Sequence, residues 1–332
     1  MNNIFDTIAN LWSDALRPAP RHLGVVILVA LVGATACGND TTSRVGSLPT
    51  STASTSTSHT TTPSAPAVPS TATATTAPRP TGAIDELVGA VGERVHVRCV
   101  GEGDTTVVLI AGFGGDSTGW ALVEPAIAAR ARVCSYDRPG TGTSDPATST
   151  GTFTTQAMDL HDLLGMVGEP GPYVVVGHSF GGAEAVTFAS LFADEVTGLV
   201  LIDASPTTWP DAVCAIPDDG SDAAAMLEGL CGMFAPTGNS EHLDAVAAFA
   251  EAAQIGSLGS LPMAVITAAR RELPADLAAA QVDRLNEAWN LGQQAWMALS
   301  TTSHLVSVEH TSHQIEIDQP GVVIDEITRL LP

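Results

Sequence analysis

Two kinds of hydrophobic pattern alternate along the C-terminal three quarters of the chain. Short continuous apolar runs are typical of strands that are buried on both faces of a sheet, and between these runs apolar residues recur at helical spacing. Strands that alternate with helices predict an α/β fold, with a mostly parallel sheet and helices on both of its faces. We expect strands at 95–100, 106–111, 131–136, 173–177, 198–203, 263–268 and 305–309, and helices at about 118–130, 154–167, 181–193, 276–299 and 320–331.

One segment, residues 205–261, breaks this alternation. It is rich in Ala, Gly and acidic residues, and it predicts the helices of a lid inserted into a domain that spans 83–332. Active sites of open parallel sheets lie at the carboxyl ends of the strands. We therefore look for catalytic residues directly after the predicted strands, and we expect the lid to decide which substrate is accepted.

The N-terminal segment of the chain follows neither pattern. Residues 23–36 form a run of 14 uncharged residues, which is shorter than the roughly 20 that span a membrane and is typical of a signal-peptide core. With the small residues before Cys37, it resembles a bacterial lipoprotein signal, which implies a leader at 1–37 and a lipidated Cys37. An ordinary secretory signal and an uncleaved anchor are the alternatives. All three predict an exported protein, a cell-envelope lipoprotein or a secreted one, that meets the membrane at most through its N-terminus.

Residues 38–82 predict a disordered linker. Between positions 41 and 80, 33 of the 40 residues are Ser, Thr, Pro or Ala. No apolar periodicity remains, so this stretch cannot bury a core of its own. Such a composition is typical of an extended tether between an anchor and a folded domain.

Charge narrows the class of protein. All 13 basic residues of the 332-residue chain are Arg, against 36 acidic residues, and the formal net charge is −23. The absence of Lys excludes a lysine-containing phosphate loop, and the lack of a basic face argues against a nucleic-acid partner. The domain alone carries −24, because 33 of the acids and nine of the Arg residues lie within it. This excess predicts a soluble surface, and the partner we expect is a small-molecule substrate.

The motif that carries chemistry lies at residues 173–183. It reads Tyr-Val-Val-Val-Gly-His-Ser-Phe-Gly-Gly-Ala, so a buried strand meets Gly-x-Ser-x-Gly and a helical pattern follows. These are the flanks of a nucleophile elbow, a sharp strand-to-helix turn that presents its serine above the sheet. The two flanking glycines are needed because side chains at those positions would clash in the turn. Ser179 is therefore the predicted nucleophile, and the N–H of Phe180, at the helix N-terminus, would face a developing oxyanion.

Four stretches together resemble the α/β-hydrolase superfamily. They are 107–115, 136–145, the elbow, and Thr311-Ser312-His313 followed by Asp318-Gln319-Pro320. The resemblance covers about 90–332 and implies the chain order serine, acid, histidine, with the histidine in the loop after the last strand. His313 fills that place, and its neighbour His310 is the alternative. A serine is a weak nucleophile without a base, so His313 would take the proton of Ser179.

Three carboxylates are candidates for the acid that would pair with His313. In the family it commonly stands directly after the strand that we expect at 263–268, but no Asp follows at once here, and Glu272 and Asp276 lie further along. Some relatives place the acid one strand earlier, where this chain has Asp203. We favour Asp203, whose role would be to hold the tautomer of His313 and to stabilise the imidazolium.

The second oxyanion donor would come from the loop after the strand expected at 106–111. The family has His-Gly-x in this loop, and this chain has Ala-Gly-Phe, so the resemblance makes the N–H of Phe113 the matching donor. Asp137 and Arg138, at the end of the next predicted strand, are interpreted as scaffolding.

Cysteine usage supports export. With Cys37 set aside for lipid, four cysteines remain, an even number that suits an oxidising compartment. The implied fold makes the strands of Cys99 and Cys134 neighbours, and the other two cysteines share the lid segment. We therefore expect the disulfides Cys99–Cys134 and Cys214–Cys231, one of three connectivities, with buried free thiols as the alternative. No Cys or His cluster has the spacing of zinc ligands, so we expect neither a metal nor a cofactor.

Together these residues predict a serine hydrolase, resembling a carboxylesterase, that cleaves an ester-type acyl bond through an acyl-enzyme. Epoxide hydrolases and haloalkane dehalogenases resemble this chain but carry Asp where Ser179 stands. A peptidase of the proline-iminopeptidase type and a cofactor-free haloperoxidase are the alternatives within the fold. A non-catalytic lipoprotein that binds a ligand or partner on a hydrolase scaffold is the alternative from another class.

Overall fold

A computed structural model describes residues 80–332, with single-residue gaps at 91, 218 and 272. The predicted leader with its lipidation site at Cys37, nearly all of the predicted linker, and Glu272 lie outside the described residues. Among the helices that are described, none is both long enough and apolar enough to cross a lipid bilayer.

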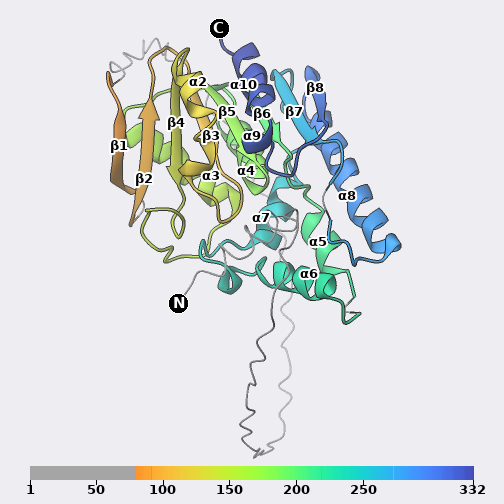
Figure 1. Cartoon of the computed structure of the whole chain (residues 1–332). Coiled ribbons are helices and arrows are strands. Elements are labelled where there is room, and N and C mark those ends of the chain that lie inside the picture. Colours follow the sequence, from red (N-terminus) through yellow and green to blue (C-terminus); the bar gives the residue numbers. More distant parts are fainter. Residues whose placement is uncertain (1–79, 91, 218, 272) are drawn as a thin grey trace, which may run out of the picture. The chain divides into compact units, whose positions relative to one another are not determined.

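The described strands form one sheet of eight (Figure 1). They are β1 (Ile84–Ala90), β2 (Glu93–Val100), β3 (Thr106–Ile110), β4 (Arg132–Asp137), β5 (Tyr173–His178), β6 (Val196–Ile202), β7 (Met263–Ala268) and β8 (Ser303–Val308). Their order across the sheet is β1-β2-β4-β3-β5-β6-β7-β8. The pairs β1–β2 and β2–β4 are antiparallel, and the other neighbouring pairs are parallel. The predicted mostly parallel sheet is therefore confirmed.

Helices cover both faces of the sheet (Figure 1). They are α2 (Glu124–Ala128), α3 (Phe153–Met166), α4 (Phe180–Leu191), α5 (Trp209–Cys214), α6 (Asp222–Gly232), α7 (Ala245–Ala252), α8 (Ala279–Ala298), α9 (Ile315–Asp318) and α10 (Pro320–Arg329), with the 3₁₀ turns η1 (Ser117–Trp120) and η2 (Pro236–Gly238). The strands β3, β4, β5 and β7 are buried along their whole length, so their side chains contribute to a core on each face. One core includes residues of α3, α4, α7 and α8, and the other includes residues of α2, α9 and α10.

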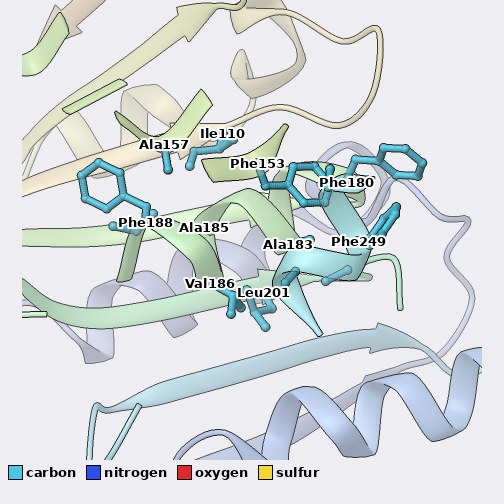
Figure 2. Close-up of a cluster of buried hydrophobic side chains, with 14 of the residues drawn as sticks. Ile110, Phe153, Ala157, Phe180, Ala183, Ala185, Val186, Phe188, Leu201 and Phe249 are labelled. Carbon is cyan, nitrogen blue, oxygen red and sulfur yellow. The ribbon is translucent and has the colours of Figure 1, made fainter. Parts of the chain in front are cut away.

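The first core fixes the start of α4. The residues of α4 from Phe180 to Ala189 are all buried. The ring of Phe180 packs edge-on against Phe249, with ring centroids 4.9 Å apart, and Phe153 packs edge-on against both (Figure 2). Such aromatic contacts add to the free energy gained by burial alone. The N-terminus of α4, directly after Ser179, is therefore held by the core rather than by solvent-exposed turns.

The observed elements differ from the expected ones in two places. Strand β1 was not expected, because it is an acidic and largely exposed edge strand without an apolar run. The helix expected at 118–130 is divided into η1 and α2. Pro125 explains the division: a proline lacks the N–H that a continuing helix would need, but it fits within the first turn of a new one.

The segment 205–261 contains the helices α5, α6 and α7, which gather at one end of the sheet (Figure 1). The disulfide Cys214–Cys231 joins α5 to α6. A second disulfide joins Cys99 to Cys134, two residues that stand opposite each other in the antiparallel pair β2–β4. The structure thus contains both disulfides that were expected.

Candidate active site

Ser179 stands at the turn between β5 and α4. Its φ of 54° and ψ of −122° place it in a region that residues with side chains rarely adopt. The turn puts Ser179 at the carboxyl end of a central strand and makes Phe180 the first residue of α4, whose N–H has no acceptor within the helix. The backbone is therefore that of a nucleophile elbow.

The glycines around Ser179 are explained by close backbone contacts. A Cβ atom added to Gly177 would lie 2.2 Å from the carbonyl oxygen of Gly181. A Cβ atom added to Gly181 would lie 2.4 Å from the carbonyl oxygen of Ala111. Neither distance is possible for a real side chain, so the turn requires glycine at both positions.

Three predicted site residues meet at this turn. Nε2 of His313 lies 2.9 Å from Oγ of Ser179, and Nδ1 of His313 lies 2.7 Å from Oδ2 of Asp203. A carboxylate only accepts hydrogen bonds, so Nδ1 carries the proton and Nε2 is left to accept the proton of Ser179. Ser179 follows β5, Asp203 follows β6 and His313 follows β8, so the three come from the same edge of the sheet.

Asp203 is buried in a shell of donors. Oδ1 accepts hydrogen bonds from the hydroxyl of Thr267 at 2.9 Å, from the indole N–H of Trp289 at 3.0 Å and from the backbone N–H of Ala268 at 3.3 Å. Burial alone would raise the pKa of Asp203, but the hydrogen bond from His313, the charge of Arg271 and the hydroxyl of Thr267 hold it at about 2. Asp203 is therefore ionised at neutral pH.

His313 is held by its backbone as well as by its ring. The ring N–H of His178, at Nε2, donates to the carbonyl oxygen of His313 over 3.0 Å, so the elbow residue next to Ser179 anchors the histidine loop. Burial lowers the pKa of His313 to about 4, while Asp203 acts in the opposite direction. About 30% of the side chain stays exposed, so solvent limits this shift. At neutral pH the imidazole is uncharged, as a general base must be.

The other candidates lie elsewhere. Oδ2 of Asp276 accepts the backbone N–H of Ala223 over 3.1 Å, so this carboxylate binds the first turn of α6 instead of His313. His310 is exposed, with a φ of 55°. Glu272 lies outside the described residues. Of the carboxylates considered for the acid, the structure brings Asp203 to His313.

A buried cation occupies the region where the family commonly has its acid. Arg271 stands three residues after β7, and its guanidinium carbon lies 3.5 Å from the ring centroid of Trp289 and 4.9 Å from that of Trp209. Nη1 of Arg271 is 3.8 Å from Oδ2 of Asp203. Oδ2 of Asp203 thus lies near both an imidazole and a guanidinium. The sequence did not indicate that Arg271 would lie beside Asp203, because an acid was expected in this region.

The loop after β3 lies against the nucleophile. A Cβ atom added to Gly112 would lie 3.2 Å from Cβ of Ser179, so the glycine allows the close approach. The rings of Phe113 and Phe180, the two residues whose N–H groups were expected to bind an oxyanion, stack with centroids 4.9 Å apart. Oγ of Ser205 lies 3.3 Å from Oγ of Ser179. Ser205 was not singled out from the sequence, although it stands two residues after Asp203 at the same strand end.

This arrangement can do nucleophilic chemistry. A hydroxyl, an uncharged imidazole and a carboxylate form one hydrogen-bonded chain beside a helix N-terminus, which favours negative charge. The Asp203 carboxylate is already engaged by side chains and by the backbone N–H of Ala268. One group of metal-type ligands in the described residues consists of Cys99, Cys134 and Glu169, but its two sulfur atoms are joined to each other in a disulfide.

Known proteins share this fold. A model of the alpha/beta hydrolase fold family matches residues 105–219. A 2-hydroxy-6-oxononadienedioate/2-hydroxy-6-oxononatrienedioate hydrolase of Cupriavidus pinatubonensis is 35% identical over 143 residues, which are 41% of this chain and 47% of that protein. A thermophilic esterase from Thermogutta terrifontis has a TM-score of 0.53 at 20% identity, over 75% of this chain and 97% of its own. The epoxide hydrolase CorEH has a TM-score of 0.52 at 19% identity, over 75% and 98%.

The family match over residues 105–219 and the likeness to solved structures show that the chain has the α/β-hydrolase fold. Its matches to the first curated relatives span about half of their length or less. Because an esterase and an epoxide hydrolase share the fold, the fold alone does not decide which bond is broken. Which bond is broken must therefore be inferred from the residues of the site.

Proposed function

We propose that the chain is an exported serine hydrolase, resembling a carboxylesterase, that cleaves ester bonds of a small-molecule substrate. The observation that carries this proposal is the hydrogen-bonded chain from Ser179 through His313 to Asp203. Relatives named as hydrolases support hydrolysis as the reaction class. A serine at the elbow, where epoxide hydrolases carry Asp, supports acyl transfer.

In the proposed reaction, Oγ of Ser179 attacks the acyl carbon while its proton passes to Nε2 of His313. The negative charge that develops on the carbonyl oxygen is stabilised by the N–H groups of Phe113 and Phe180. The bond to the leaving oxygen then breaks, and His313 gives that oxygen the proton. Water, activated by His313, hydrolyses the acyl-enzyme and restores Ser179. Asp203 stays ionised and stabilises the imidazolium in both halves.

Export and lipidation are a second part of the proposal. Two disulfides in the described domain support folding in an oxidising compartment. The apolar run before Cys37 supports a leader peptide, with Cys37 as the lipid-bearing residue. In a bacterial host that processes lipoproteins, the wild-type chain should partition into detergent, and a Cys37→Ser variant should stay in the aqueous phase. Equal partitioning of the two would contradict lipidation.

A substrate panel tests the reaction class. We expect p-nitrophenyl esters of increasing acyl length to be hydrolysed, and Ser179→Ala to lower kcat by about 10³-fold or more. Ser307→Ala, at an exposed position in β8, is the matched control and should keep the wild-type rate. Activity on aminoacyl p-nitroanilides alone would favour a peptidase, and peroxide-dependent halogenation alone a haloperoxidase. An oxononadienedioate completes the panel because a relative is named for it. Turnover of nothing in the panel would favour a non-catalytic binding protein.

A further inference from the structure

A buried guanidinium lies behind the loop that follows β3. Arg138 directly follows β4, and its side chain is 5% exposed. Nη1 donates to the carbonyl oxygen of Ala111 over 2.8 Å, and Nη2 donates to that of Gly112 over 2.5 Å. Arg138 was interpreted from the sequence as scaffolding. These two bonds place its guanidinium on the peptide units next to the proposed nucleophile.

The bond to Gly112 determines where the next N–H points. The carbonyl of Gly112 and the N–H of Phe113 belong to one peptide unit, which is planar and trans, so the two groups point in opposite directions. Because Arg138 binds the carbonyl, the N–H of Phe113 is directed away from Arg138. Gly112 itself lies against Ser179, as its contact distance shows. The same peptide unit therefore joins Arg138 to the expected oxyanion donor.

Glu241, from the segment 205–261, binds both Arg138 and the loop after β3. It lies three residues after η2, and its side chain is 1% exposed. Oε2 accepts from Nε of Arg138 over 2.7 Å, and Oε1 accepts the backbone N–H of Gly114 over 2.6 Å. Glu184 also faces Arg138, but at 3.4 Å and with its other oxygen bound by the hydroxyl of Tyr136. Glu241 is therefore the close ionic partner.

We propose that Arg138 is a positioning residue for catalysis: with Glu241, it fixes the peptide unit of Gly112 and Phe113 so that the Phe113 N–H meets the oxyanion. The inference rests on the proposed function, since it needs an oxyanion to form at Ser179. A buried ion pair is weak evidence for stability, because an apolar pair of the same size often stabilises a fold as well. The bonds to two carbonyls and one N–H of a single loop give this pair a different role, which is to orient that loop.

The chain offers a matched control at the other end of the same strand. Arg132, the first residue of β4, is equally buried and pairs with Glu169. Like Arg138, it also binds two backbone carbonyls, those of Gly82 and Gly101. Parallel strands present their catalytic ends at one edge, and Arg132 lies at the opposite edge. Its replacement changes a buried Arg–Glu pair without touching the loop.

The experiment compares Arg138→Lys, Glu241→Gln and Arg132→Lys with the wild type on the best ester. Lysine keeps the charge but lacks the fork that binds two carbonyls at once, and glutamine keeps an acceptor for Gly114. We expect kcat to fall about 10- to 100-fold in Arg138→Lys and less in Glu241→Gln, with KM within about threefold, because a misplaced donor acts on the transition state. Arg132→Lys should keep kcat, even where its Tm falls.

The outcomes separate the two proposals. Wild-type kcat in folded Arg138→Lys, or equal losses of kcat in Arg138→Lys and Arg132→Lys, would overturn the positioning role. If Arg138→Lys does not fold, Glu241→Gln decides the matter, and an unchanged kcat in that variant would overturn it. An ester turnover that persists in Ser179→Ala would overturn the proposed function itself, and the inference with it.

Discussion

Asp203 Oδ2 lies 2.7 Å from His313 Nδ1, and Asp203 follows β6 instead of β7. The position after β7 belongs to a cation, Arg271, whose guanidinium stacks on Trp289. The acid and its neighbouring charge are thus placed on adjacent strands. The site leads to separate predictions for the acid, for the cation and for the loop that contacts Ser179.

Replacing the acid should abolish most of the activity. Asp203→Asn keeps the size of the side chain but removes the acceptor that holds the His313 tautomer, so kcat should fall by about 10⁴-fold. Asp276→Asn is the control, because Asp276 binds the first turn of α6. Ester hydrolysis by both variants provides the measurement. A severe loss in Asp276→Asn with little loss in Asp203→Asn would contradict the assignment of the acid.

The pH dependence of kcat/KM should change when Arg271 is replaced, because Arg271 affects the pKa of His313. His313 must be uncharged to act as a base, and burial lowers its pKa to about 4, below the ordinary 6.5. Asp203 favours the charged imidazolium, while His178 and Arg271 disfavour it. Removing the cation in Arg271→Gln should therefore raise the pKa of His313 and move the acid limb of kcat/KM to higher pH.

The control for this change is Arg270→Gln, because Arg270 is the exposed neighbour of Arg271. Its acid limb should coincide with that of the wild type. The pH profile of kcat/KM between about pH 4 and pH 8 gives the comparison, because a change of about 1.4 kcal/mol in the proton affinity of His313 moves the midpoint of the limb by about one pH unit. An acid limb that moves to lower pH in Arg271→Gln, or that moves equally in both variants, would show that Arg271 does not act on His313.

The close approach of the loop to the nucleophile can be tested with one methyl group. In Gly112→Ala the new Cβ would lie 3.0 Å from Nδ1 of His178 and 3.2 Å from Cβ of Ser179, so the loop has to shift. Small displacements at a reacting centre can cost about 10²-fold in rate, and we expect kcat to fall by about 10-fold or more. Gly119→Ala, which meets no atom within 4 Å, should keep the wild-type kcat. Equal rates for the two variants would contradict the proposed packing.

From the two disulfides we predict how many thiols react and how much the free energy of unfolding depends on the Cys214–Cys231 bond. In the denatured but unreduced protein, Cys99, Cys134, Cys214 and Cys231 should not react with a thiol reagent. Replacing both Cys214 and Cys231 by Ser should lower the free energy of unfolding by about 2–4 kcal/mol in a urea titration. Four reactive thiols before reduction would rule the disulfides out.

Much of the fold could be read from the sequence because its strands are buried on both faces. Continuous apolar runs mark β3, β5 and β7 without knowledge of their neighbours. Strand β1 escaped notice since an edge strand needs no apolar run, and it is defined by its pairing with β2. The division between η1 and α2 depended on Pro125, a signal that was present in the sequence but not used.

The site could be predicted where its residues follow a local motif. Ser179 is marked by its glycines, and His313 by its place after the last strand. The acid stayed open because the choice among Asp203, Glu272 and Asp276 depends on which strand end faces His313, a relation across the sheet. Arg138 and Glu241 are 103 residues apart in the chain, so their pairing around the β3 loop could not be inferred from spacing.

Whether Ser179 is the nucleophile is tested most directly by the mass of the elbow peptide after incubation with a fluorophosphonate. We expect one adduct, on Ser179, that forms quickly in the wild type and far more slowly in His313→Ala, because the base activates the serine. A wild-type protein that stays unmodified at Ser179, or that carries its adduct on another serine, would contradict the central claim that Ser179 is the nucleophile.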